Sequence, residues 1–109
     1  MTEPLRSQPA DGQRERLEAT VRGRVQGVGF RYYVMRMANR QGLTGWVANE
    51  ADGSVRCVIE GSPDELERIE TMLRHGPPGS VVEAVQAVRM PATGRFERFE
   101  VRSAGHTGD

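Results

Sequence analysis

The feature that most constrains the fold is a change in apolar spacing on either side of a short glycine-rich break, Gln26–Gly29. Before the break, residues 17–25 alternate apolar and polar side chains, which is typical of a half-buried strand. After it, apolar residues recur at three- and four-residue intervals from Phe30 to Ala38, which is typical of one helical face. The sequence therefore predicts a strand, a glycine turn and a helix at the start of the folded region.

The remaining elements are a second helix and four more strands, marked by capping signals and by alternating apolar residues. A capping box, SPDE at residues 62–65, starts the helix. A turn sequence, EADG at residues 50–53, joins the first two of these strands into a hairpin. The strands are predicted at residues 44–49, 54–60, 81–90 and 96–102.

The order β-α-β-β-α-β, with one extra edge strand, indicates an α+β fold of the ferredoxin-like type. It is a two-layer sandwich with two helices on one face of a four- or five-stranded antiparallel sheet. In the usual order the third strand lies between the first and the second, so these two run in the same direction. Their C-terminal ends then lie at one sheet edge, about 10 Å apart. We therefore expect Asn49 at the same edge as the glycine-rich turn.

Length and composition limit the class of protein. The 109 residues suit one domain at 17–103, flanked by tails at 1–16 and 104–109 that we expect to be disordered. No run approaches the roughly 20 apolar residues of a membrane span, and the first residues lack the apolar stretch of a signal peptide. One cysteine, Cys57, excludes an internal disulfide and a zinc cluster. We expect a cytoplasmic monomer whose Cys57 is a core thiol.

Charge is balanced overall but unevenly distributed. The chain has 15 basic and 15 acidic residues, yet residues 19–49 contain five arginines and no acidic residue. Such a basic third should present a local positive field and so favour an anionic partner. The alternative is a solvated helix face with no binding role.

The segment GRVQGVGFR at residues 23–31 is the strongest local signal of a binding site. Glycines at 27 and 29 can adopt positive φ, so that successive backbone N–H groups point into one concavity beside the positive end of the next helix. Arg31 could add a bidentate fork to a phosphate or carboxylate held there. The alternative is an ordinary strand–helix turn followed by a solvated arginine, because the spacing lacks the Walker and dinucleotide fingerprints.

Asn49 also has two interpretations. Asparagine favours turns because its side chain hydrogen-bonds nearby backbone. At the shared sheet edge, however, its amide could orient a water against a phosphorus atom held by the glycine-rich loop.

Two motifs together, VRGRVQGVGFR at residues 21–31 and GWVANEADGSV at 45–55, resemble the signature motifs of the acylphosphatases. The resemblance extends through FERFEV at 96–101. It implies a ferredoxin-like fold and hydrolysis of the carboxyl-phosphate bond of small-molecule acyl phosphates, by in-line attack of water and without a metal or other cofactor. Inorganic phosphate is then expected as product and inhibitor.

The same resemblance implies roles for individual residues. By motif position, Arg31 is the catalytic arginine that holds the phosphate, and Asn49 orients the nucleophilic water. Glu50 stands where some family members have a threonine, and we expect its side chain to point away along the turn. The loop residues expected to bind phosphate, mainly through backbone N–H groups, are Gly23, Val25, Gln26, Gly27, Val28, Gly29, Phe30 and Arg31.

Two other functions compete with this interpretation. A nucleic-acid-binding module of the same broad fold would use the basic third and the sheet aromatics, but the aromatic-rich RNP1 pattern is absent and aromatics make up only 6% of the chain. We therefore expect neither a nucleic-acid nor a membrane partner. The second alternative is a catalytically idle anion-sensing domain, or a detached relative of the acylphosphatase-like domain of hydrogenase-maturation carbamoyltransferases.

Overall fold

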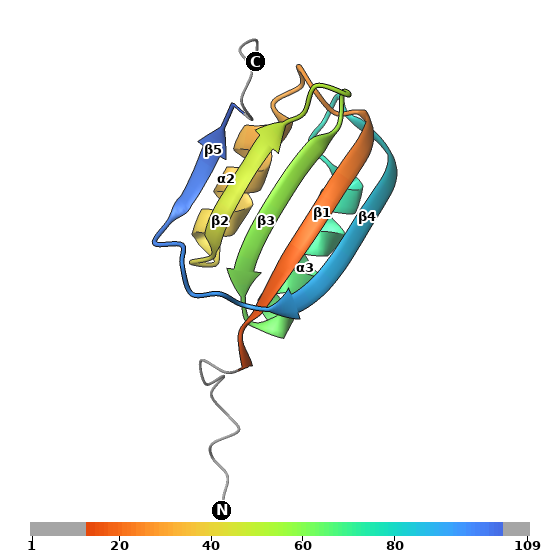
Figure 1. Cartoon of the computed structure of the whole chain (residues 1–109). Helices are drawn as coiled ribbons and strands as arrows, with labels where there is room; N and C mark the ends of the chain where they lie inside the picture. The colour runs from red at the N-terminus through yellow and green to blue at the C-terminus, as the bar shows by residue number, and fades with distance from the viewer. Residues whose placement is uncertain (1–12, 104–109) are drawn as a thin grey trace, which may run out of the picture.

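A five-stranded sheet carries two helices on one face (Figure 1). The computed structural model describes residues 13–103, so most of the predicted N-terminal tail and the C-terminal tail at 104–109 lie outside the described residues. The architecture confirms the predicted α+β, ferredoxin-like sandwich. The strands are β1 (Glu15–Arg24), β2 (Thr44–Asn49), β3 (Val55–Gly61), β4 (Val81–Pro91) and β5 (Phe99–Arg102), and the helices are α2 (Phe30–Arg40) and α3 (Pro63–His75).

The strand order across the sheet is β4-β1-β3-β2-β5. β1 and β2 both pair antiparallel with β3, which lies between them. They therefore run in the same direction, as predicted, and both end at the upper edge of the sheet in Figure 1. The prediction of a wholly antiparallel sheet is wrong for one pair, because β5 pairs parallel with β2.

The direction of β5 follows from the connection that precedes it. β4 is antiparallel to β1, so it ends at the lower edge in Figure 1, and residues 92–98 cross that edge before the chain turns up into β5. The crossing also explains why the last strand starts at Phe99 and not at the predicted residue 96. Glu60 anchors the crossing, because its carboxylate accepts hydrogen bonds from the Thr93 N–H (2.9 Å), the Thr93 hydroxyl (2.8 Å) and the Gly94 N–H (2.9 Å).

Glu60 is a buried acid with only 1% of its surface exposed. Burial alone would raise the pKa of its carboxyl. The hydrogen bonds from Thr93 and Gly94, together with the Arg16 guanidinium 3.6 Å away, outweigh burial and hold that pKa below its ordinary value. The ionised carboxylate therefore stabilises the fold.

β1 begins at Glu15, two residues before the predicted strand, so the prediction of a tail up to residue 16 is wrong at its end. The apolar alternation that marks the strand in the sequence starts only at Leu17. The length of a central strand depends instead on the backbone partners offered by its neighbours. Glu15 and Arg16 pair with Gly61 and Glu60 of β3 and with Pro91 and Met90 of β4.

The helix α2 begins at Phe30, as the spacing predicts, with Gly29 as its N-cap residue. At its other end, Gly42 takes a φ of 70° and the Leu43 N–H donates to the Ala38 carbonyl oxygen at 2.9 Å. This six-to-one hydrogen bond is the signature of a Schellman motif, which stops the helix and turns the chain toward β2.

The helix α3 begins with the predicted capping box. The Ser62 hydroxyl accepts from the Glu65 N–H (3.2 Å), and the Glu65 carboxylate accepts from the Ser62 N–H (2.9 Å). Each bond satisfies a backbone donor that the helix itself cannot pair. Within residues 13–103, no helix is long and apolar enough to cross a membrane.

The hydrophobic core lies between the helices and the sheet. Cys57, in the central strand β3, belongs to it and has no exposed surface, which confirms the predicted core thiol. Burial raises the pKa of this thiol to about 12, although the charge of Arg56 opposes the shift. The helical side chains of the core are Phe30, Val34 and Ala38 of α2 and Leu66, Ile69 and Leu73 of α3.

Candidate active site

Two glycines set the backbone conformation of the loop between β1 and α2. Gly27 and Gly29 take φ values of 78° and 82°, in the left-handed region. A Cβ at either position would meet no atom within 4 Å, so packing does not require glycine there. Positive φ does, and such residues let neighbouring N–H groups converge on one concavity.

The start of α2 adds positive charge to this loop. Within the described chain, no side chain caps the N-terminus and the first turn holds no acidic residue. The first-turn N–H groups and the positive end of the helix dipole are therefore available to an anion. Phe30, only 2% exposed, fixes the first turn to the core, and Arg31 extends from the next position.

Gly23 belongs to the strand and not to the loop. It lies in β1 opposite Val82 of β4, next to an irregularity in the pairing. A Cβ at this position would collide with the backbone carbonyl of Val81, so close strand packing explains the glycine. Val25 is 1% exposed and packs in the core, which leaves its backbone as the first group of the loop.

Asn49 is the last residue of β2 and only 6% exposed. Among residues 13–103, none donates to or accepts from its side-chain amide. The hydrogen bonds expected of a turn residue are made instead by Asp52, whose carboxylate accepts from the Ser54 N–H (2.9 Å) and the Ser54 hydroxyl (2.6 Å). Asn49 therefore does not make the local hydrogen bonds that a turn role would require, and a buried amide without a protein partner is rare and costly.

The loop and the Asn49 hairpin are joined by one side chain. The Gln26 Nε2 donates to the carbonyl oxygens of Glu50 (2.8 Å) and Ser54 (2.9 Å), and the Glu50 N–H donates to the same Ser54 oxygen (2.8 Å). The sequence predicts only a backbone role for Gln26, and its side chain is the feature that sequence reasoning missed. The available signal for a side-chain role was a glutamine placed between an apolar residue and a glycine in a tight loop.

An exposed ion pair forms a second link between β1 and the same hairpin. The Arg22 Nη1 lies 3.0 Å from the Asp52 Oδ2, with both side chains about half exposed. Hydrogen bonds from the Ser54 hydroxyl and N–H, and then from Arg22, lower the pKa of Asp52 to about 2. Asp52 is therefore charged at neutral pH and keeps the turn closed.

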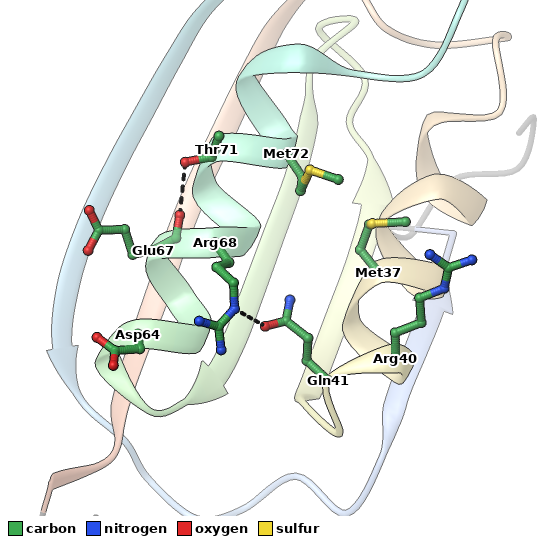
Figure 2. A pocket seen from close by; sticks show the side chains of 8 residues that line it. All are labelled: Met37, Arg40, Gln41, Asp64, Glu67, Arg68, Thr71 and Met72. Atoms are coloured by element: carbon green, nitrogen blue, oxygen red, sulfur yellow. Dashed lines mark hydrogen bonds between the residues drawn. The ribbon is translucent and has the colours of Figure 1, made fainter.

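Two hollows lie near α2, and one of them borders the loop. It has a volume of about 530 Å³ and is lined by Val28, Gly29, Tyr32, Tyr33, Arg36, Met37, Pro77 and Pro78. The other, about 510 Å³, lies between α2 and α3, and its lining contains none of the predicted site residues. Figure 2 shows Met37 and Met72 facing each other across it, and Arg68 donating to the Gln41 side chain (3.1 Å).

No group of three or more His, Cys, Asp or Glu residues within positions 13–103 is arranged to hold a metal ion. The loop and the first turn of α2, which carries Arg31, follow the end of β1, and Asn49 ends β2 at the same edge of the sheet. The protein is therefore a small α+β domain of the ferredoxin-like class with a glycine-rich loop at one sheet edge.

Comparisons with known proteins identify the family. The acylphosphatase family model matches residues 17–101. An acylphosphatase of Paraburkholderia xenovorans (strain LB400) is 48% identical over 80 residues, which cover 73% of this chain and 82% of the relative. The chain belongs to the acylphosphatase family, as its two motifs predict.

Solved structures agree with this assignment. The crystal structure of acylphosphatase from Bacillus subtilis matches with a TM-score of 0.78 and 34% identity, covering 81% of this chain and 98% of that one. Full-length HypF in its phosphate- and nucleotide-bound form matches with a TM-score of 0.77 and 26% identity. That match covers 84% of this chain but only 12% of HypF.

Proposed function

We propose that Arg31, the Val25–Phe30 loop and Asn49 carry out the hydrolysis of acyl phosphates that family membership assigns to this chain. The loop N–H groups and the Arg31 guanidinium hold the phosphoryl oxygens. The Asn49 amide orients the attacking water in line with the bond to be broken. The products are a carboxylate and inorganic phosphate.

The chemistry suits this small set of groups. The leaving carboxylate has a conjugate acid with a pKa near 4, so it departs at neutral pH without a general acid. What remains is to hold the phosphoryl group, offset its charge and align the water. Backbone N–H groups, an arginine and an amide can do this. A phosphate ester, whose leaving alkoxide is far more basic, should be a poor substrate.

One observation supports the assignment most strongly, namely the buried Asn49 amide without a partner among the described residues. It lies at the sheet edge where the glycine loop lies, and Gln26 connects the two. A turn role for Asn49 would not explain its unpaired buried amide, and a solvated loop would not explain the connection through Gln26.

The main test is hydrolysis of benzoyl phosphate by the full chain and by Arg31→Ala and Asn49→Ala. We expect turnover by the full chain, loss of turnover in both variants, and loss of inorganic phosphate binding in Arg31→Ala alone. Phosphate binding without turnover by the full chain would point instead to an idle anion-binding domain.

No observation favours the nucleic-acid alternative. Trp46 lies on the sheet, but the Arg102 guanidinium covers its ring at 5.0 Å from the centroid, so this ring does not offer a free stacking surface. The proposal also includes competitive inhibition by inorganic phosphate, because the product occupies the same loop as the phosphoryl group of the substrate. It further includes a monomeric state and, from the single cysteine, a cytoplasmic location.

A further inference from the structure

We infer that the side chain of Gln26 is a positioning residue that sets the distance between the phosphate loop and Asn49. The inference rests on the proposed function, because it concerns how the two halves of that site are held together. It assigns a role to the side chain, separate from any contact of the Gln26 backbone with phosphate.

The sheet registers Asn49 with β1, because Asn49 pairs with Val55 and Val55 pairs with Val21, but the loop and the 50–54 turn lie beyond these pairings. The loop follows β1 and Asn49 ends β2, and these strands are not neighbours, because β3 lies between them. Their ends are therefore about 10 Å apart. Beyond the last paired residues, the position of each segment depends on contacts outside the strand ladder.

Gln26 supplies such a contact at the point where it matters for Asn49. One of its acceptors is the carbonyl of Glu50, the residue directly after Asn49, and the other is the carbonyl of Ser54 across the turn. Ser54 is 2% exposed and is itself held by Asp52. A single amide group thus fixes both sides of the 50–54 turn relative to the loop.

The other link, between Arg22 and Asp52, is poorly suited to this task. Both side chains are about half exposed to solvent, and exposed ion pairs contribute little to rigidity. The Gln26 bonds are part-buried and short, and they connect the chain across 24 and 28 residues. The position of the 50–54 turn relative to the loop therefore depends mainly on Gln26.

In-line attack is sensitive to such a link. Reacting atoms must approach to about 3–3.5 Å, and a displacement of about 1 Å can lower the rate on the order of 10²-fold. Loss of the Gln26 side chain should leave the strand pairing and the loop N–H groups in place but free the 50–54 turn and the loop to shift relative to each other. Binding of phosphate should survive, whereas alignment of the water should not.

The experiment compares Gln26→Met, which keeps length but removes the donor, with the control Arg22→Gln, which breaks only the exposed link. For Gln26→Met we expect kcat on benzoyl phosphate to fall roughly 10-fold or more, with the dissociation constant of inorganic phosphate changed less than about 3-fold. For Arg22→Gln we expect kcat within about 2-fold of wild type. Wild-type kcat in Gln26→Met, or an equal loss in both variants, would overturn the inference.

A double-mutant cycle with Asn49→Ala shows whether Gln26 acts through Asn49. If it does, adding Gln26→Met to Asn49→Ala should lower kcat no further, because the water is already unaligned. Losses that multiply would overturn the positioning role while leaving Asn49 in the site. Wild-type turnover by Asn49→Ala itself would remove the proposed site and this inference with it.

Gln26→Glu provides a second variant of the same size in case Gln26→Met fails to fold. An ionised carboxylate cannot donate and would face two carbonyl oxygens, whereas a protonated one can donate to one of them. The kcat of Gln26→Glu relative to wild type should therefore be low at neutral pH and rise as the pH is lowered. A ratio near one at all pH values would contradict the positioning role.

Discussion

Asn49→Ala should make the protein inactive but no less stable. The residue is 6% exposed, and among residues 13–103 its side-chain amide has no hydrogen-bond partner. Removing an unsatisfied buried amide should recover about 1–3 kcal/mol of desolvation free energy. Removing three heavy atoms should cost about 1 kcal/mol through the small cavity left behind. The free energy of unfolding should therefore stay the same or rise by up to about 2 kcal/mol.

Melting temperature reports this change directly. For a domain of this size, each kcal/mol corresponds to roughly 4–8 °C, so the melting temperature of Asn49→Ala should be unchanged or higher by up to about 8–16 °C. The same substitution should lower kcat by a factor on the order of 10²–10³, as when a single preorganised polar donor is deleted. The dissociation constant of inorganic phosphate should change little, since the loop and Arg31 remain.

Thermal unfolding, phosphate titration and benzoyl phosphate hydrolysis on one preparation give all three quantities. Asn39→Ala is a matched control, because Asn39 is an exposed asparagine on α2 and its loss should leave kcat unaltered. A turn role for Asn49 predicts the opposite pattern, with about 1 kcal/mol of lost stability and nearly normal kcat. That pattern would refute the reasoning from its buried amide.

Three further outcomes are expected. Arg31→Lys should recover little of the activity lost in Arg31→Ala, because a point charge does not replace a planar fork, and near-normal kcat in the lysine variant would contradict the bidentate contact. Since hydrogen bonds and Arg16 hold the pKa of Glu60 below its ordinary value, the stability it contributes is present above about pH 4.3 and is lost as the pH falls through the lower, folded-state pKa. The melting temperature should accordingly drop on acidification, and less steeply in Glu60→Gln, as thermal scans from pH 7 to pH 3 can measure. Turnover should persist in excess EDTA while inorganic phosphate inhibits competitively, and activity restored by Mg²⁺ after chelation would argue against the proposed mechanism.

Local patterns were enough to predict the elements that form the site. The glycine-rich break, the start of α2 at Phe30 and the capping box of α3 depend on residues close together in the sequence. The placement of Asn49 at the edge that holds the loop followed from strand order, which the alternation of elements already indicated. The elements were predictable because short-range spacing determines them, and the position of Asn49 was predictable because the order of elements is typical of one strand order.

Other features depend on contacts that the sequence does not display. The parallel direction of β5 depends on the path of residues 92–98, which Glu60 anchors from a distant strand. The early start of β1 depends on partners in β3 and β4. The side chain of Gln26 acts on residues 24 and 28 positions away, so its motif position alone could not reveal its hydrogen bonds.

The burial of Cys57 gives the protein an internal reporter of its own opening. Cys57 carries the only thiol in the chain and lies buried in the central strand β3. An alkylating reagent cannot reach this thiol while the core is closed. Burial also raises the pKa of the thiol to about 12, so the reactive thiolate is scarce in the closed molecule. Labelling therefore requires separation of β3 from the helices that cover it. The rate of modification in native buffer therefore measures the population of opened molecules without any introduced probe. The rate of Cys57 labelling can be compared with and without saturating phosphate. The decrease in that rate would show how far a ligand at the sheet edge suppresses opening of the core.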